Sequence, residues 1–419
     1  YRMTGAYCKV REQFKVPLGK FEGVQEYMAR IGGFTYLLES ARLFTAGAVD
    51  LGAKPALASA ISKYHMTEMC RECSDAAFDI HAGRAIQAGP RNYLANMYLA
   101  VPVAITVEGA NILTRSLMIF GQGAVRCHPY TFDEMQALQD KDKARGLKTF
   151  DALLIKHLGY TLRNVTRTVA AGLTNGHCLR VPFKDYTAKY YKQLTRMSTA
   201  LAFIADMAML VLGGELKRKE GLSARLGDVL SYLYLASSAL KYFRDHDCQA
   251  DDRAHLEWCL QYALYQMQEA FYGFFENFTA PLLARALRFA VFPYGRVYTL
   301  PSDALSSTIS EQMMTPGTFR DRLTQHAFVG KTQDDATGRV EMAFEKMLGI
   351  EPLLRRVTDA ARKGIVPLRG NVDERLQALK KANLFSDEEY AEIAEFEKLR
   401  LDALEVDEFA PDYFKEIEA

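Results

Sequence analysis

The segment 21-FEGVQEYMARIGGFTYLLESARLFTAGAV-49 decides the fold class of this 419-residue chain. Its apolar residues recur every three or four positions, at Phe21, Val24, Met28, Ile31, Phe34, Leu38 and Ala41. This spacing predicts a helix with one apolar face. Leu51-Gly52 closes the pattern, and Pro55 suits the first turn of the next helix. The same spacing fills most of the chain and period-2 alternation is nearly absent, so the sequence predicts an all-α fold of helices packed as a bundle.

Two helical regions follow one another, and we expect a domain boundary between 1–130 and 131–419. In the first region, an opening helix ends near 16–19, and further helices cover about 21–49, 55–81, 92–107 and 110–120, with a kink at Pro102. The second region opens with the charged segment 133–148, an exposed helix or linker. Helices are predicted after it at 150–173, 185–212, 221–244, 253–278, 338–363, 373–382 and 387–408. Ser386 and Glu389 form the capping pattern that starts the last of these.

The composition is that of an ordinary soluble globular protein, with 49% hydrophobic and 25% charged residues. The net charge of +1 gives no reason to expect a nucleic acid as partner. Seven scattered cysteines suit a reduced, cytoplasmic protein, and the CxxC of Cys70 and Cys73 lies in a helical pattern without a second pair. The best membrane-spanning candidate, 201–214, is too short and contains Asp206. The chain opens at Tyr1 in helical rhythm without a cap, which we interpret as the start of a fragment.

Several kinds of catalytic site are excluded by their missing motifs. The chain has no paired Glu-x-x-His segments for a di-iron bundle, no GxSxG and no GxxxxGK[ST]. His65, His81 and His128 have no spacing that indicates a shared metal site, so we interpret each as a structural histidine and expect no metal.

One carboxylate stands out in the apolar segment 101-VPVAITVEGANILTRS-116. Glu108 is followed at once by Gly109, which breaks the helical pattern, and a new pattern then runs to Arg115. An ionised carboxylate is costly to bury without a partner. Two alternatives therefore remain open from the residues alone: Glu108 faces solvent at a helix end, or it lines an apolar cavity, ready to take a proton.

Four elements in order along the chain resemble the C-terminal helical domain of the acyl-CoA dehydrogenases over about 1–129. They are Arg11-Glu12-Gln13-Phe14 with Pro17, then Gln25, then 79-DIHAGR-84, and then 108-EGAN-111. Residues 205–243, together with 288-RFAVFPYGR-296 and 108–130, resemble the long bacterial fatty-acid β-oxidation type with an extra C-terminal helical domain.

The resemblance implies particular roles for matching residues. Glu108 falls on the catalytic base, and Arg11 on the arginine that contacts the FAD pyrophosphate of a neighbouring subunit, where a guanidinium suits phosphate. Gln25, Gly83 and Gly109 fall at flavin-binding positions. The chain departs from the family pattern at four positions: Lys15 and Ala82 replace glycines, Asp79 a glutamine and Ala110 a threonine.

The implied activity is α,β-desaturation of an acyl-CoA thioester, with FAD as cofactor and an electron-transfer flavoprotein as electron acceptor. At least a dimer is implied by the role of Arg11. An acyl-CoA oxidase and a non-enzymatic helical scaffold derived from the family remain as alternatives. Residues 283–300 mix arginines with apolar side chains, so they are either a core helix with a turn or a contact with a membrane surface. We therefore expect a cytoplasmic protein, peripheral at the inner membrane if that contact exists.

Overall fold

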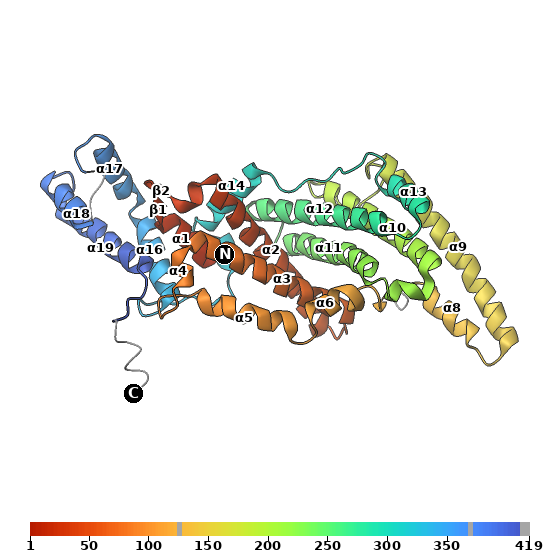
Figure 1. Cartoon of the computed structure of the whole chain (residues 1–419). Helices are drawn as coiled ribbons and strands as arrows, with labels where there is room; N and C mark the ends of the chain where they lie inside the picture. Colours follow the sequence, from red (N-terminus) through yellow and green to blue (C-terminus); the bar gives the residue numbers. More distant parts are fainter. Residues whose placement is uncertain (124–127, 368–371, 411–419) are drawn as a thin grey trace, which may run out of the picture. The chain divides into compact units, whose positions relative to one another are not determined.

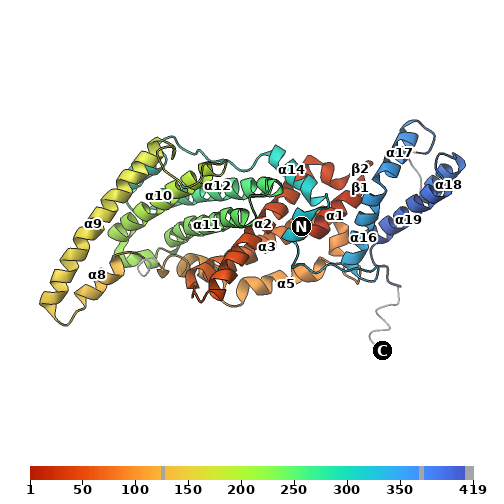
Figure 2. The same cartoon turned by 180° about the vertical axis from the view of Figure 1, so that it is seen from behind.

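The structure is a computed structural model, and it describes residues 1–123, 128–367 and 372–410 (Figures 1 and 2). In these ranges all regular secondary structure is helical apart from one short hairpin, so the predicted all-α fold class is confirmed. Two compact units are present. Unit 1 comprises Tyr1–Gly32, Arg71–Ala100 and Asp303–Ala419, and unit 2 comprises Gly33–Cys70 and Val101–Ser302. Each unit combines segments from both sides of residue 130, and the domain boundary expected there stays a prediction.

The elements up to residue 123 are α1 (Arg2–Val10), β1 (Glu12–Gln13), β2 (Val16–Pro17), η1 (Leu18–Lys20), α2 (Glu22–Asp50), α3 (Ala56–His81), α4 (Gly83–Ile86), α5 (Ala95–Thr106), α6 (Asn111–Leu113) and the π-helical η2 (Thr114–Met118). The middle of the chain forms α8 (Thr131–Leu138), α9 (Lys143–Leu173), α10 (Ala188–Leu212), η3 (Gly213–Lys217), α11 (Glu220–Asp245), η4 (Ala250–Asp252), α12 (Arg253–Asn277) and α13 (Pro281–Val291). The last elements are α14 (Asp303–Met313), α15 (Thr318–Leu323), α16 (Ala336–Gly349), α17 (Glu351–Arg362), α18 (Val372–Lys381) and α19 (Asp387–Leu404).

In unit 1, the first helix of the chain packs against elements from the end of the chain. Helix α1 contacts α14 and α16, and α16 packs on α19. Buried apolar side chains fill these contacts, among them Cys8, Val10 and Phe344. Ser386 caps α19, with Glu389 completing the reciprocal capping box, so the predicted start of the last helix is confirmed.

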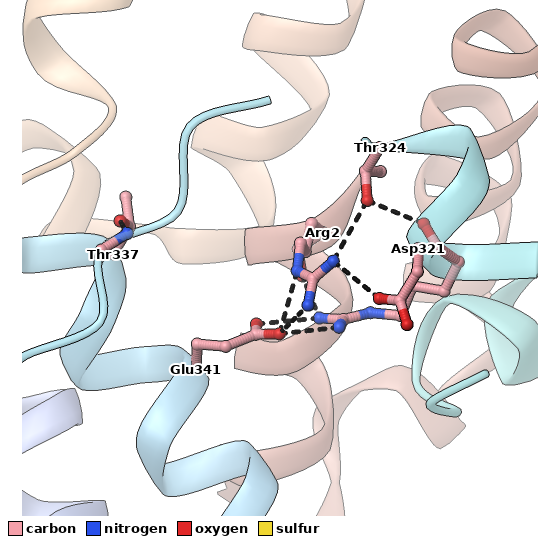
Figure 3. A network of polar contacts seen from close by, with 7 residues as sticks. Arg2, Asp321, Thr324, Thr337 and Glu341 are labelled. Carbon is pink, nitrogen blue, oxygen red and sulfur yellow. Dashed lines mark hydrogen bonds and ion pairs between the residues drawn. The ribbon is translucent and has the colours of Figure 1, made fainter. Parts of the chain in front are cut away.

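A charged network connects α1, α15 and α16 (Figure 3). Arg320 donates to both carboxylate oxygens of Glu341 at 2.8 and 2.9 Å, and Arg2 donates to the same carboxylate at 2.6 and 2.9 Å. Arg2 also pairs with Asp321 at 2.9 Å. Burial alone would raise the pKa of Glu341, but the hydrogen bonds and charges of Arg320 and Arg2 outweigh it and hold that pKa below its usual value.

Unit 2 is a bundle in which α11 and α12 run side by side, with α10 packed on both (Figures 1 and 2). The long helix α9 packs on α10, α8 and α13. Asp142 caps α9 by accepting two backbone N–H groups. Buried aromatic side chains dominate α12: the rings of Trp258 and Tyr262 stack with their centroids 5.1 Å apart, and Phe34 from α2 forms a T-shaped pair with Trp258 at a centroid distance of 5.4 Å.

Several predicted boundaries were wrong. The opening helix ends at Val10 instead of 16–19, because Phe14 and Lys15 adopt φ values of 50° and 66° and turn the chain into the β1–β2 hairpin. The helix predicted at 110–120 is a short α-helix followed by a π-helical turn. The single helix predicted at 338–363 is two helices that meet at Ile350. Helices α14 and α15 were not predicted at all. Pro102 lies inside α5, and the kink expected there stays a prediction.

The sequence analysis judged the apolar segment 201–214 too short to span a membrane, but the helix that contains it is longer. Ala188–Lys217 is long and apolar enough to cross a membrane by length and composition, with a mean hydropathy of 1.7 over its most apolar window. Half of that window is buried inside the chain, as expected for the core helix of a bundle. In the segment 283–300, α13 buries Ala284, Leu287 and Val291, whereas Phe289 is exposed.

Candidate active site

Glu108 lies where the chain breaks between α5 and α6. The helical segments on either side, Ala95–Thr106 and Asn111–Met118, are bent by 48° relative to each other. The break is sharp because two consecutive residues have positive φ, 55° at Glu108 and 100° at Gly109. The Glu108 side chain is exposed and has no hydrogen-bond or ion-pair partner within 1–123, 128–367 and 372–410. Of the two alternatives that the sequence left open, this chain therefore shows the solvent-facing carboxylate at a helix end.

Lys63 and Asn111, to which the sequence analysis assigned no role, connect this break to α3 by hydrogen bonds. Lys63 of α3 donates from its ammonium group to the carbonyl oxygens of Ile105 at 3.2 Å and Gly109 at 2.7 Å, and to the Asn111 side-chain oxygen. Asn111 donates in turn to Thr67 of α3 at 2.8 Å. No signal in the sequence links Lys63 to residue 111, because the two are 48 positions apart.

Arg11 directly follows α1 and has an extended backbone. Its backbone N–H donates to Tyr7 at 2.8 Å and its carbonyl accepts from Leu18 at 2.8 Å, so the backbone is held on both sides of the β1–β2 hairpin. The half-buried guanidinium forms no hydrogen bond or ion pair with any residue that the structure describes. Its five N–H donors therefore remain available for an anionic group.

Gln25 and Gly83 lie in the same unit as Arg11. The Gln25 amide donates to the carbonyl of Gly19 at 3.2 Å, which orients that side chain near the start of α2. Gly83 is exposed at the start of α4, and a Cβ added there would meet no atom within 4 Å. The chain's own packing thus gives no reason for glycine at position 83, and the space beside it is open.

Two departures from the family pattern keep a backbone that glycine favours. Ala82, just before Gly83, has φ 51° and ψ −133°, and Lys15 has φ 66°. Both positions carry glycine in the family pattern, and side chains with a Cβ rarely adopt such angles. The turns survive the substitutions at the cost of local strain.

His81 directly precedes the turn that contains Ala82 and Gly83. His81 donates to the carbonyl of Ala77 at 2.7 Å, accepts from the Tyr93 hydroxyl at 2.6 Å and stacks on Tyr7 at 4.0 Å. Burial penalises the imidazolium and lowers the pKa of His81 to about 3. Buried and neutral, His81 has the properties of a structural histidine.

In unit 2, His65 is also buried, which lowers its pKa to about 3, and it packs against Tyr64 and Tyr232. His65 thus also has the properties of a structural histidine.

His128, His157 and Asp206 form a separate cluster in unit 2, with their potential ligand atoms within 4.8 Å of one another. The His128 Nδ1 accepts two backbone N–H groups at the start of α8, so its proton lies on Nε2 and is donated to Asp206 at 2.8 Å. A metal on that Nε2 would leave the ring without either proton. His157 bonds to Glu134 at 2.9 Å, and Thr161 donates to Asp206 at 2.7 Å. These contacts explain the cluster as a hydrogen-bond network that joins α8, α9 and α10.

The predicted site residues fall into both units. Glu108 and Gly109 belong to unit 2, whereas Arg11, Gln25 and Gly83 belong to unit 1. Unit 2 therefore carries the carboxylate and one flavin-binding candidate, Gly109, and unit 1 carries the other three candidates.

Comparison with known families gives a match for each of two consecutive regions of the chain. Residues 125–409 match the family model described as acyl-CoA dehydrogenase, C-terminal, bacterial type. The chain belongs to the acyl-CoA dehydrogenase family. Residues 1–119 match a second model of that family, the acyl-CoA dehydrogenase C-terminal domain. Glu108, Arg11, Gln25 and Gly83 all lie within this second match.

A solved structure shares the fold. It is the crystal structure of acyl-CoA dehydrogenase complexed with FAD from Bacillus anthracis, which matches 75% of this chain with a TM-score of 0.54 and 16% sequence identity. The match covers 52% of that protein, so this chain corresponds to about half of its length.

Proposed function

We propose that the protein containing this chain is an FAD-dependent acyl-CoA dehydrogenase of fatty-acid β-oxidation, with Glu108 as the base that removes the α-proton of the acyl-CoA thioester. The observation that carries the proposal is the position of Glu108. Within the match to the family's C-terminal domain, it is a carboxylate at a helix break with no partner among the residues that the structure describes. A general base must come within hydrogen-bond reach of the proton that it removes, and an exposed carboxylate at a helix break is accessible to a substrate.

The residues of unit 1 fit the binding of FAD. Arg11 presents a guanidinium with no partner among the described residues, which suits a pyrophosphate. Gly83 has open space where a side chain would otherwise stand, and the preceding backbone has the positive φ that glycine favours. Gln25 is oriented by Gly19 and supplies an amide. When bound, FAD supplies the acceptor for the hydride that leaves the β-carbon.

The chain's own residues then have separate tasks. Glu108 takes the α-proton, and the positive φ of Glu108 and Gly109 turns the backbone so that this carboxylate projects from the helix break. We further propose that an electron-transfer flavoprotein accepts the electrons and that the protein forms at least a dimer, in which Arg11 serves the FAD of a neighbouring subunit. A cytoplasmic location belongs to the same proposal, with peripheral contact at the inner membrane only if residues 283–300 touch a membrane surface.

The test is Glu108→Gln in the whole FAD-containing protein. Amide and carboxyl have nearly the same shape, so acyl-CoA should still bind, while reduction of the flavin by acyl-CoA should slow by about 10²- to 10⁴-fold. Glu220→Gln is the matched control, because Glu220 is also an exposed glutamate near a helix end in unit 2. Near-normal flavin bleaching in the Glu108 variant would refute the assignment. Hydrogen peroxide release would indicate an acyl-CoA oxidase, and a whole protein without flavin would indicate a scaffold.

A further inference from the structure

The ammonium group of Lys63 makes all three of its hydrogen bonds to the chain around Glu108. Its acceptors are the carbonyl of Ile105, the carbonyl of Gly109 and the side-chain oxygen of Asn111. A lysine ammonium has three N–H donors, so none remains for another partner. The acceptors stand three residues before Glu108, one residue after it and three residues after it. The lysine therefore binds the break on both sides of the carboxylate.

Asn111 strengthens the same attachment. Only 2% of this residue is exposed, and it starts α6, the helix that follows the break. Its amide donates to Thr67 and Glu68 of α3, both at 2.8 Å, while its oxygen accepts from Lys63. Three side chains of α3 thus form hydrogen bonds with Asn111 at the start of α6. All of these residues lie in unit 2 with Glu108.

The break needs such an attachment for two physical reasons. Glu108 is not glycine, and its φ of 55° lies in a region that side chains with a Cβ disfavour. The carbonyl groups at the end of α5 also lack partners inside the helix, and a lysine is a favourable partner for them. Burial lowers the pKa of Lys63, and the charge of Glu68 opposes that effect. Without Lys63, the segment 107–110 could relax to angles that are more favourable for glutamate.

We propose that Lys63, supported by Asn111, is a positioning residue for the catalytic base: it holds the Glu108-Gly109 break in the conformation that presents the carboxylate to the α-carbon of the acyl-CoA. The inference rests on the proposed function of Glu108. Lys63 itself touches neither substrate nor flavin in this scheme. Its effect on the reaction passes through the backbone of residues 105–111.

The experiment uses the whole FAD-containing protein with Lys63→Met, which keeps the length of the side chain and removes its three donors. Lys54→Met is the control, since Lys54 is an exposed lysine just before α3 whose side chain has no partner among the described residues. Flavin reduction at saturating acyl-CoA should slow by about 10- to 100-fold, because small misplacements of a reacting group have effects of this size. The dissociation constant of acyl-CoA and the FAD content should stay near those of the unchanged protein. Lys63→Arg, which keeps the charge and several donors, should recover part of the rate.

A second measurement separates positioning from general stability. Amide hydrogen exchange in Lys63→Met should speed up at residues 107–111 and stay unchanged along α10–α12. If Lys63→Met does not fold, Asn111→Ala removes one acceptor and the link to Thr67 and should give the same local pattern. A rate within twofold of Lys54→Met, or a loss of protection over the whole chain, would overturn the inference. Glu108→Gln keeps the two proposals apart: if that variant stays active the proposed function fails, whatever Lys63 does.

Discussion

Substitution by alanine is expected to change the stability of the protein in opposite directions at two glycines of the same helix. Gly33 and Gly47 both lie inside α2 and both belong to unit 2. A Cβ built on Gly33 would lie 2.0 Å from Cε3 of Trp258 and 2.4 Å from Cδ2 and Cζ3. A Cβ on Gly47 would meet nothing within 4 Å. Alanine has the same helical advantage over glycine at both positions, so a difference in stability between the two variants reports the steric environment alone.

The expected magnitudes follow from these surroundings. Glycine inside a helix costs about 0.5–1 kcal/mol relative to alanine, so Gly47→Ala should raise the free energy of unfolding by that amount. Gly33→Ala makes the same gain but must displace the indole of Trp258, which is only 5% exposed and stacked on Tyr262. Overpacking of this kind costs about 1–3 kcal/mol. With the indole clamped and the overlap this large, the net result should be a loss of about 2 kcal/mol.

The assay is urea denaturation followed by fluorescence, which is direct here because Trp258 is the sole tryptophan of the chain. Gly33→Ala should also shift the emission of the folded state, since the substitution moves the indole itself, whereas Gly47→Ala should leave the emission unchanged. Circular dichroism of both variants confirms that the helices persist. Equal shifts in the same direction for the two variants would refute the steric reasoning.

Two further predictions concern unit 1. Glu341→Gln removes the carboxylate that faces the buried Arg320, and should lower the free energy of unfolding by about 3–5 kcal/mol at pH 7 in urea denaturation, because an uncompensated buried charge remains. The pKa of Glu341 lies below its ordinary value, so this stabilisation is present above about pH 4.3, the ordinary pKa of glutamate, and is lost as the pH falls through the folded-state pKa. A denaturation series from pH 6 to pH 3 should therefore show a steeper fall for the unchanged chain than for Glu341→Gln. Ala82→Gly should relieve about 1–3 kcal/mol of backbone strain at φ 51° and add about 0.5–1 kcal/mol of chain entropy cost. The free energy of unfolding, measured by urea or thermal denaturation, should therefore rise by about 1 kcal/mol. A lower free energy of unfolding in this variant would show that the backbone at position 82 is not strained.

Helices with a continuous apolar face could be predicted closely from the sequence. The spacing from Phe21 gave 21–49 for α2, which covers Glu22–Asp50, and the pattern at 253–278 matches α12, Arg253–Asn277. Helix α14 was missed because its buried face is half polar: Ser306 and Ser310 are buried beside Ile309 and Met313. The periodicity of apolar residues does not reveal a buried helix face in which half of the side chains are serine.

The candidate site was only partly predictable, for a related reason. Glu108 could be identified because it interrupts an apolar run and is followed by glycine, both of which are local signals. Lys63 could not, because a lysine in an amphipathic helix usually lies on the solvated side. Its role depends on three oxygens that stand 42 to 48 residues further along the chain. Only the packing of α3 behind the break shows where this ammonium group goes.

The departures from the family pattern also change meaning once the backbone is known. At Lys15 and Ala82, glycine is replaced, yet φ remains at 66° and 51°. If the substitutions had abolished the glycine turns, the backbone would have relaxed to negative φ, where a Cβ causes no strain. The turn geometry is instead kept against an energetic cost, as expected when the surrounding structure or a ligand requires it. What differs from the family pattern at Lys15 and Ala82 is therefore the presence of a Cβ, while the backbone at both positions keeps the positive φ that glycine favours.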